Sequence, residues 1–280
     1  MKFRSDINGL RAVAVLIVVL FHFAVPGFSG GYVGVDVFFV ISGYLMAQII
    51  CDRCRQGGFS FYDFYMARVR RIFPALIVMV ALVLLFAGFI LLPTEYEVLG
   101  RHAFASIAVF SNILYWRESG YFDEDALDKW LLHTWSLSVE WQFYLIIPLA
   151  LVLAIRFRSG VYLIPLLWIA FVSSLLLCVV ASSRYEVAAF YLLPTRAWEF
   201  LLGTLVFVHA PRLGWLSRPL FLHAGLLLIV GCTWLYSKAL DYPSFWPLLP
   251  TLGAALVIGS AARSPLLDSR PMQFLGKTSY

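Results

Sequence analysis

The stretch Arg11-Ala-Val-Ala-Val-Leu-Ile-Val-Val-Leu-Phe-His22 decides the fold, because ten consecutive apolar residues separate an arginine from a histidine. Apolar residues continue after His22 as far as Val25, so the stretch is typical of a membrane-spanning helix. In a helix the offset from Arg11 to His22 is about three turns, and both side chains project from nearly the same face, about 16 Å apart along the axis. An imidazole inside a bilayer costs free energy, so the pair indicates a functional site.

The composition is that of a membrane protein. Hydrophobic residues make up 61% of the 280 residues, charged residues 13%, and the mean hydropathy is +0.84, whereas soluble domains hold roughly 25% charged residues. The apolar stretches are continuous rather than alternating, which favours helices over a β-barrel. We therefore expect an all-α polytopic membrane protein with about eight transmembrane helices in this chain. The predicted spans are 7–25, 34–50, 74–92, 139–155, 162–181, 191–209, 219–237 and 247–262.

Basic residues in the short loops predict the orientation. If the ambiguous stretch 100–116 does not cross the membrane, every basic loop falls on the side of the N-terminus. If it does cross, the three later basic clusters move to the opposite side and the acidic residues of 118–128 become cytoplasmic. We therefore expect eight crossings, a cytoplasmic N-terminus, and an outward-facing or re-entrant segment over 93–138, a length at which connecting segments usually carry function.

His22 is the first candidate catalytic residue. A neutral imidazole in a low-dielectric cavity can take a proton from an attacking hydroxyl, which is the chemistry of a general base. The alternative is a histidine packed between helices. Asp36 enters the second span close in sequence to His22 and is predicted to orient the imidazole, as carboxylates commonly do; the alternative is a cap at the helix start.

The sequence Arg68-Val-Arg-Arg71 is the second candidate. Arg68 and Arg71 are three residues apart and share one helix face, and Pro74 is suited to the first turn of a helix. Guanidiniums just before a helix N-terminus predict a site for a phosphate-bearing ligand. Ordinary positive-inside topology would explain the same arginines without any ligand.

Charged residues at the outward ends of two later spans complete the candidates. His133 and Glu140 open the fourth span, where they could line the outward end of the His22 cavity, although Glu140 is also a first-turn glutamate favoured by the helix dipole. Arg196 and Glu199 are three residues apart and can pair. A structural ion pair is the better interpretation for them, although intramembrane charges often mark a substrate pathway.

The cysteines predict no metal site. Cys51 and Cys54 have zinc-like spacing, but no second pair and no nearby histidine completes a set of ligands.

Six ordered motifs give the chain a close resemblance to the acyltransferase-3 family of membrane O-acyltransferases. They are Arg4-Ser-Asp-Ile-Asn-Gly-Leu-Arg11 through His22, Gly31-Tyr-Val-Gly-Val-Asp36-Val-Phe-Phe-Val-Ile-Ser-Gly43-Tyr, Phe61-Tyr with Arg68-x-x-Arg71-Ile-Phe-Pro, Ser111-Asn with Tyr115-Trp-Arg, His133-Thr-Trp135-Ser-Leu-Ser-Val-Glu140, and Thr195-Arg-Ala-Trp-Glu-Phe-Leu-Leu-Gly203. The resemblance covers essentially the whole chain.

This resemblance implies transfer of an acyl group, usually acetyl from cytosolic acyl-CoA, to a hydroxyl of a glycan handled outside the cytoplasmic (inner) membrane. O-antigen, peptidoglycan and exopolysaccharide are open as acceptors. On this view Arg11, Arg68 and Arg71 bind the donor, and no metal or nucleic acid takes part. The catalytic residues are His22, Asp36 and Glu140, and the acceptor side holds His133, Trp135, Arg196 and Glu199.

Two departures from the family pattern are visible. Relatives often read Val-Glu-Glu-Gln where this chain has Val-Glu140-Trp141-Gln142, so a role is expected for the first glutamate only. Relatives also continue through about two more spans, often with an extracytoplasmic SGNH-type domain, so residues 1–280 are expected to be an acyltransferase-3 membrane domain incomplete at its C-terminus. Two alternatives stay open. One is a glycan or acyl-carrier transporter or flippase, which leaves its substrates chemically unchanged, and the other is an inactive truncated product.

Overall fold

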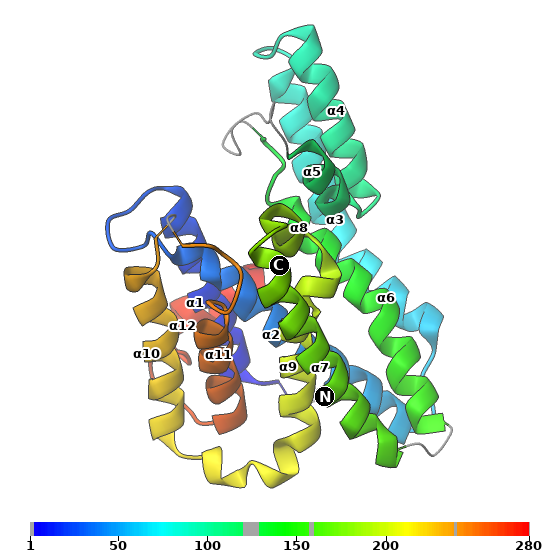
Figure 1. Cartoon of the computed structure of the whole chain (residues 1–280), viewed down its shortest axis with the longest axis vertical. Coiled ribbons are helices and arrows are strands. Elements are labelled where there is room, and N and C mark those ends of the chain that lie inside the picture. The colour runs from blue at the N-terminus through cyan, green and yellow to red at the C-terminus, as the bar shows by residue number, and fades with distance from the viewer. Residues whose placement is uncertain (1–2, 120–128, 157–159, 238–239, 280) are drawn as a thin grey trace.

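The computed structural model describes residues 3–119, 129–156, 160–237 and 240–279, and over these residues the chain is helical with no strand. The elements follow one another as an antiparallel bundle, with an arm formed by α3, α4 and α5 standing beyond it (Figure 1). The helices are α1 (Ser5–His22), α2 (Gly34–Arg55), α3 (Phe61–Ala87), α4 (Pro93–Ile107), α5 (Ser111–Glu118), α6 (Thr134–Arg156), α7 (Gly160–Ser182), α8 (Glu186–Tyr191), α9 (Leu193–His209), α10 (Pro219–Leu235), α11 (Leu248–Ser260) and α12 (Arg270–Thr278).

Each of the eight predicted spans overlaps a helix, and the all-α membrane fold is confirmed, while the number of crossings stays a prediction. Five helical stretches are long and apolar enough to cross a membrane: Ser5–His22, Gly31–Arg55, Phe61–Ala87, Thr134–Arg156 and Tyr162–Ser182. The later helices are shorter, with 17 residues in α9 and α10 and 13 in α11. The ends of α2, α6 and α11 and the connection from α9 to α10 lie together at the lower end of Figure 1, so the basic ends of these helices share one side of the bundle.

Helix α3 corrects one boundary. The sequence predicts a span that starts at Pro74, but the helix begins at Phe61, where the Ser60 hydroxyl accepts a hydrogen bond of 3.2 Å from the backbone N–H of Asp63. Pro74 therefore lies inside a continuous helix. The expectation that Arg68 and Arg71 precede a helix N-terminus is wrong, and no helix-end amides contribute to an anion site there.

The segment 93–138 is largely helical rather than an irregular loop. Helix α4 packs against the second half of α3 through an apolar cluster that includes Leu76, Val80 and Leu99. A buried hydroxyl network joins α4 and α5 to the start of α6, with the Oγ of Ser106 2.8 Å from the Oγ1 of Thr134. The acidic residues predicted at 123–128 lie outside the described residues. The placement of this segment outward or re-entrant in a membrane stays a prediction.

Helix α2 is the central element of the bundle, and glycines bring it into backbone contact with α9. A Cβ added at Gly43 would lie 1.8 Å from the carbonyl oxygen of Phe200, and one at Gly203 would lie 1.9 Å from that of Val40. Small residues at such crossings are how membrane helices pack without a hydrophobic driving force between them. The hydroxyl of Thr204 adds a hydrogen bond of 3.2 Å to the carbonyl of Gly43.

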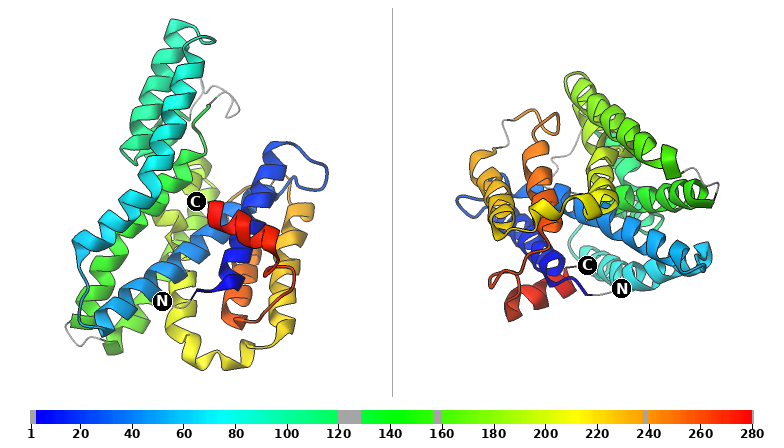
Figure 2. Two further views of the ribbon diagram at one scale, coloured as in Figure 1. Left: turned by 180° about the vertical axis from the view of Figure 1, so that it is seen from behind. Right: turned by 90° about the horizontal axis from the view of Figure 1, so that it is seen from below.

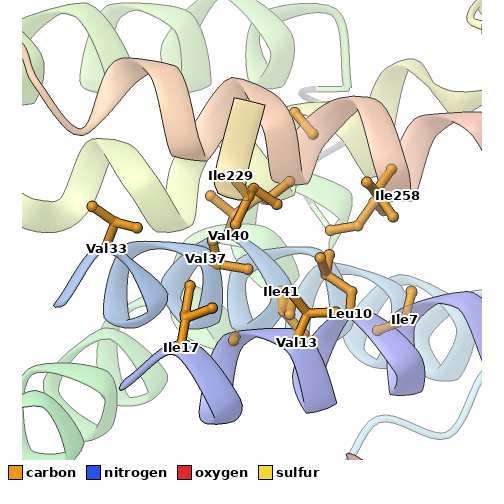
Figure 3. Close-up of a cluster of buried hydrophobic side chains, with 14 of the residues drawn as sticks. Ile7, Leu10, Val13, Ile17, Val33, Val37, Val40, Ile41, Ile229 and Ile258 are labelled. Atoms are coloured by element: carbon orange, nitrogen blue, oxygen red, sulfur yellow. The ribbon is translucent and has the colours of Figure 1, made fainter. Parts of the chain in front are cut away.

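Two apolar clusters meet on α2. One joins it to α1, α10 and α11, with Leu10, Val37 and Ile229 completely buried (Figure 3). The other joins it to α3, α6 and α9. Seen from behind, α12 lies across α1, where Gly276 sits against the backbone of Asn8 (Figure 2). This packing leaves α1, α2, α3 and α6 around a shared interior space.

Candidate active site

A cavity of about 330 Å³ lies between α1, α2, α3 and α6. Its volume is in the range typical of ligand pockets, roughly 300–1,000 Å³. Most of its wall is apolar and comes from α2, including Phe38, Phe39, Leu45 and Ile49. The polar side chains that line it are Arg11, Ser42, Arg68, Arg71, Ser136, Glu140, Tyr144 and Ser279.

Three guanidiniums from two helices face this cavity. Arg11 on α1 is 6% exposed, and its Nε donates a hydrogen bond of 3.3 Å to the hydroxyl of Ser279. Arg68 on α3 stands over the ring of Phe64 at 4.7 Å, with its Nη2 3.4 Å from the sulfur of Met46. Arg71 lies one turn further along α3; it and the neighbouring Arg70 are both exposed, but only Arg71 lines the cavity. Arg11, Arg68 and Arg71, predicted from the sequence as one group, are therefore brought together.

Glu140 is the one acidic side chain in the described lining of the cavity, and it is held by two hydroxyls. Its Oε1 accepts hydrogen bonds from the Oγ of Ser42 and from the phenol of Tyr144. The tyrosine lies on the same helix face one turn after the glutamate, while the serine comes across from α2. Glu140 also lies within electrostatic range of Arg11 and Arg71. The site thus combines a carboxylate, two hydroxyls and a cationic end in one space.

His22 and His133 are neighbours, and neither is among the residues that line the described cavity. His22 is exposed at the last position of α1, and its Nδ1 lies 2.8 Å from the carbonyl oxygen of Val18. The pKa of His133 is lowered from its ordinary value, first by desolvation of the imidazole and then by the nearby His22. His133 comes three residues before Ser136, which lines the cavity. The expectation that His22 lies inside a low-dielectric cavity is therefore wrong for this structure, because its imidazole is exposed at the end of α1.

Asp36 does not orient His22, which corrects the expectation from the sequence. Its two carboxylate oxygens accept hydrogen bonds from the Nη2 of Arg196 and from the phenol of Tyr242. The reason is helical geometry. Gly34 faces α1, where an added Cβ would lie 2.5 Å from the carbonyl of Ala14, and a residue two positions later points about 200° away from it.

Arg196 and Glu199 belong to this same closed cluster. The Nη1 of Arg196 is 3.2 Å from the Oε1 of Glu199, and both side chains are at most 1% exposed. Trp135 is also buried, with its ring 4.7 Å from that of Phe190. None of these three predicted acceptor-side residues lines the described cavity. The ion pair expected between Arg196 and Glu199 is present, and it includes Asp36.

Sequence reasoning missed Ser42, Tyr144 and Tyr242. The spacing from Glu140 to Tyr144 is one helical turn and could have suggested their hydrogen bond. Ser42 lies within a motif quoted for the family resemblance, but its contact with Glu140 depends on the crossing of α2 and α6. Tyr242 reaches Asp36 from the connection between α10 and α11, which no pattern in the sequence marks.

Comparisons with known proteins identify the family of the chain. The chain matches the family described as "Acyltransferase domain" over residues 4–280. It is 34% identical to a protein of Komagataeibacter xylinus named as the membrane-bound transacylase BcsY, over 99% of this chain and 70% of the relative. An uncharacterized protein of Haemophilus influenzae is 32% identical over 82% of this chain and 98% of the relative.

A third relative is the O-acetyltransferase OatA of Staphylococcus aureus, 28% identical over 100% of this chain. The chain spans about half of that protein, since the match covers 49% of its length. No solved structure matches the chain.

An apolar helical bundle with a charged internal cavity, together with these matches, defines a membrane-embedded acyltransferase. The chain belongs to the acyltransferase-3 family of membrane O-acyltransferases.

Proposed function

We propose that the protein moves an acyl group, acetyl in the first instance, from cytosolic acyl-CoA to a hydroxyl of a glycan on the far side of the inner membrane. The observation that carries this proposal is the grouping of Arg11, Arg68 and Arg71 at a cavity that also holds the carboxylate of Glu140. A cationic end suits the phosphates of the donor, and the apolar wall suits its acyl-thioester end.

The cavity and the two histidines support different steps of this reaction. The guanidiniums bind the donor through its phosphates, so that the thioester extends toward Glu140 and Ser42. His22, at the end of α1, and His133, just before α6, are neighbours outside the cavity, and we propose that an acceptor hydroxyl arrives beside them. There His22 acts as the general base, taking the proton from that hydroxyl as it attacks the acyl group. Asp36, Arg196 and Glu199 support the site by fixing α2 against α9.

The side of the membrane from which the donor and the acceptor arrive follows from the basic loops. The positive-inside rule gives the end that carries Arg55, Arg156 and Arg212 to the cytoplasm, and with it the N-terminus. Reporter fusions at Ser217 and at Ser29 test the arrangement. We expect a cytoplasmic signal at Ser217 and an extracytoplasmic signal at Ser29, and the reverse pair would overturn the assignment of donor and acceptor sides.

The reaction itself is tested in membrane vesicles supplied with labelled acetyl-CoA on the cytoplasmic face. We expect label to appear in envelope glycan in proportion to donor, and mass spectrometry of the glycan to lose acetyl esters when the gene is deleted. O-antigen, peptidoglycan and exopolysaccharide fractions are analysed separately to name the acceptor. A glycan moved across the membrane without any change in its mass would instead identify a transporter.

A further inference from the structure

Ser42 lies near the middle of the stretch of α2 that lines the cavity. Along α2, Met46, which contacts Arg68, is about 6 Å away in one direction, whereas Val35 lines the cavity about 10 Å away in the other direction. The residue is 6% exposed and lines the cavity, so its hydroxyl is reached through this space rather than from the outer surface.

The surroundings of this hydroxyl are those of an activated nucleophile. The Oγ of Ser42 donates a hydrogen bond to the Oε1 of Glu140, which is the arrangement of a nucleophile beside its general base. The phenol of Tyr144 donates to the same oxygen and fixes the carboxylate in place. Phe38 and Phe39 form part of the adjacent wall, and an apolar wall protects a reactive ester from water.

The backbone around Ser42 is held rigidly. Gly43 follows directly and presses against the carbonyl of Phe200 on α9. Because successive residues of a helix point about 100° apart, this contact turns the Ser42 side chain toward α6 and the cavity. Precise positioning of this kind is what a covalent step requires.

We propose that Ser42 carries the acyl group as an ester between the donor and the acceptor. This inference rests on the proposed acyl transfer and adds a covalent intermediate to it. In the first step the Ser42 oxygen attacks the thioester carbonyl, its proton passes to Glu140, the carbon–sulfur bond breaks, and the proton then passes to the leaving thiolate. In the second step the acceptor oxygen attacks the serine ester and gives its proton to His22, the ester bond to Ser42 breaks, and that proton passes from His22 by way of Glu140 to the Ser42 oxygen.

The competing interpretation is that Ser42 only joins α2 to α6 through an interhelical hydrogen bond. The two differ in what happens to the protein when donor is present and acceptor is absent. A carrier serine becomes acetylated, whereas a structural serine does not. They also differ for Ser42→Cys, since a thiol can carry an acetyl group as a thioester that neutral hydroxylamine cleaves, and a serine ester resists that treatment.

The test incubates the full chain in membrane vesicles with labelled acetyl-CoA and no glycan, followed by peptide mass spectrometry. We expect an acetyl adduct on the peptide that contains Ser42, and the same adduct in His22→Ala, because the first step does not use His22. Ser42→Ala should lose both the adduct and, by about 100-fold or more, the transfer to glycan. Ser42→Cys should give an adduct that neutral hydroxylamine removes.

Ser136→Ala is the matched control, because Ser136 is a second hydroxyl in the lining of the same cavity, bonded instead to the carbonyl of His133. It should keep the adduct on Ser42. Glycan transfer at a normal rate by Ser42→Ala, or the absence of any adduct in His22→Ala and Ser42→Cys, overturns the covalent role and leaves the proposed function standing. No transfer from acetyl-CoA by the unmodified protein overturns both.

Discussion

Two charged clusters lie inside this apolar bundle, and they differ in what their charged groups face. Asp36, Arg196, Glu199 and Tyr242 contact one another, are at most 9% exposed, and do not line the described cavity. The cavity cluster instead sets three guanidiniums and one carboxylate around a space of about 330 Å³. Burial alone therefore does not identify a functional charge in a membrane protein, because the closed cluster is the more deeply buried of the two.

The largest effect is expected from His22, the proposed general base. His22→Ala should lower acyl transfer by about 10²–10⁴-fold, the usual cost of losing a general base, with no loss of membrane insertion. His223→Ala is the matched control, because His223 is also exposed and its Nδ1 also lies against the carbonyl four residues earlier, at 2.7 Å. Turnover by His22→Ala equal to that of the control would remove His22 from the reaction.

Replacing Arg196 should instead lower the stability of the folded protein strongly. Arg196→Met leaves the buried carboxylates of Asp36 and Glu199 without their cation, and breaking a buried ion pair costs about 3–5 kcal/mol. We expect a clearly lower melting temperature in detergent. The exposed Arg71→Met should keep the melting temperature and lose donor use instead. An equal loss of stability in the two variants would erase the distinction between the clusters.

A moderate effect is expected when lysine replaces the cavity arginines, because the charge is kept but the planar guanidinium is lost. Arg68→Lys and Arg71→Lys should raise the apparent KM for acyl-CoA about 10-fold, because lysine cannot make the two parallel hydrogen bonds that guanidinium offers to a phosphate. Arg70→Lys is the control, since Arg70 is on the same helix but does not line the cavity. Equal KM values in all three variants would assign these arginines to topology alone.

The smallest effect concerns the two imidazoles. Because His22 contributes to the lowered pKa of His133, His22→Ala should raise the pKa of His133 toward its ordinary value. The larger cause, desolvation, stays in place, so the recovery should be partial. Titration of isotope-labelled histidine by NMR measures the shift. An unchanged pKa of His133 would mean that His22 does not lie close enough to affect it.

The sequence was sufficient to predict the membrane fold, because apolar runs of about 20 residues have one stable solution in a bilayer. It was also sufficient to group Arg11 with Arg68 and Arg71, since the parity of the spans gives them the same membrane surface. The boundary of α3 could not be read in this way. The charged residues among 61–71 hid the first three turns, and Pro74 resembled a helix start although it lies within the helix.

The hydrogen-bond partners of the buried charged residues could not be predicted from sequence patterns. Asp36 is close to His22 in sequence, but its direction depends on Gly34 lying against α1, which is a tertiary contact. The hydrogen bond between Ser42 and Glu140 likewise joins residues 98 positions apart. Spacing predicts which residues share a helix face, and it says little about which face another helix will meet.

The glycine contact between α2 and α9 has a consequence for how a donor enters. With backbone against backbone at Gly43 and Gly203, no side chain is present that could change rotamer and let these two helices separate. By contrast, 17% of the most apolar window of α3 is buried, against 72% for the stretch that contains α2. The wall of the cavity formed by α2 is therefore held in place. We expect α3, two of whose arginines line the cavity, to be the wall that moves when a donor enters.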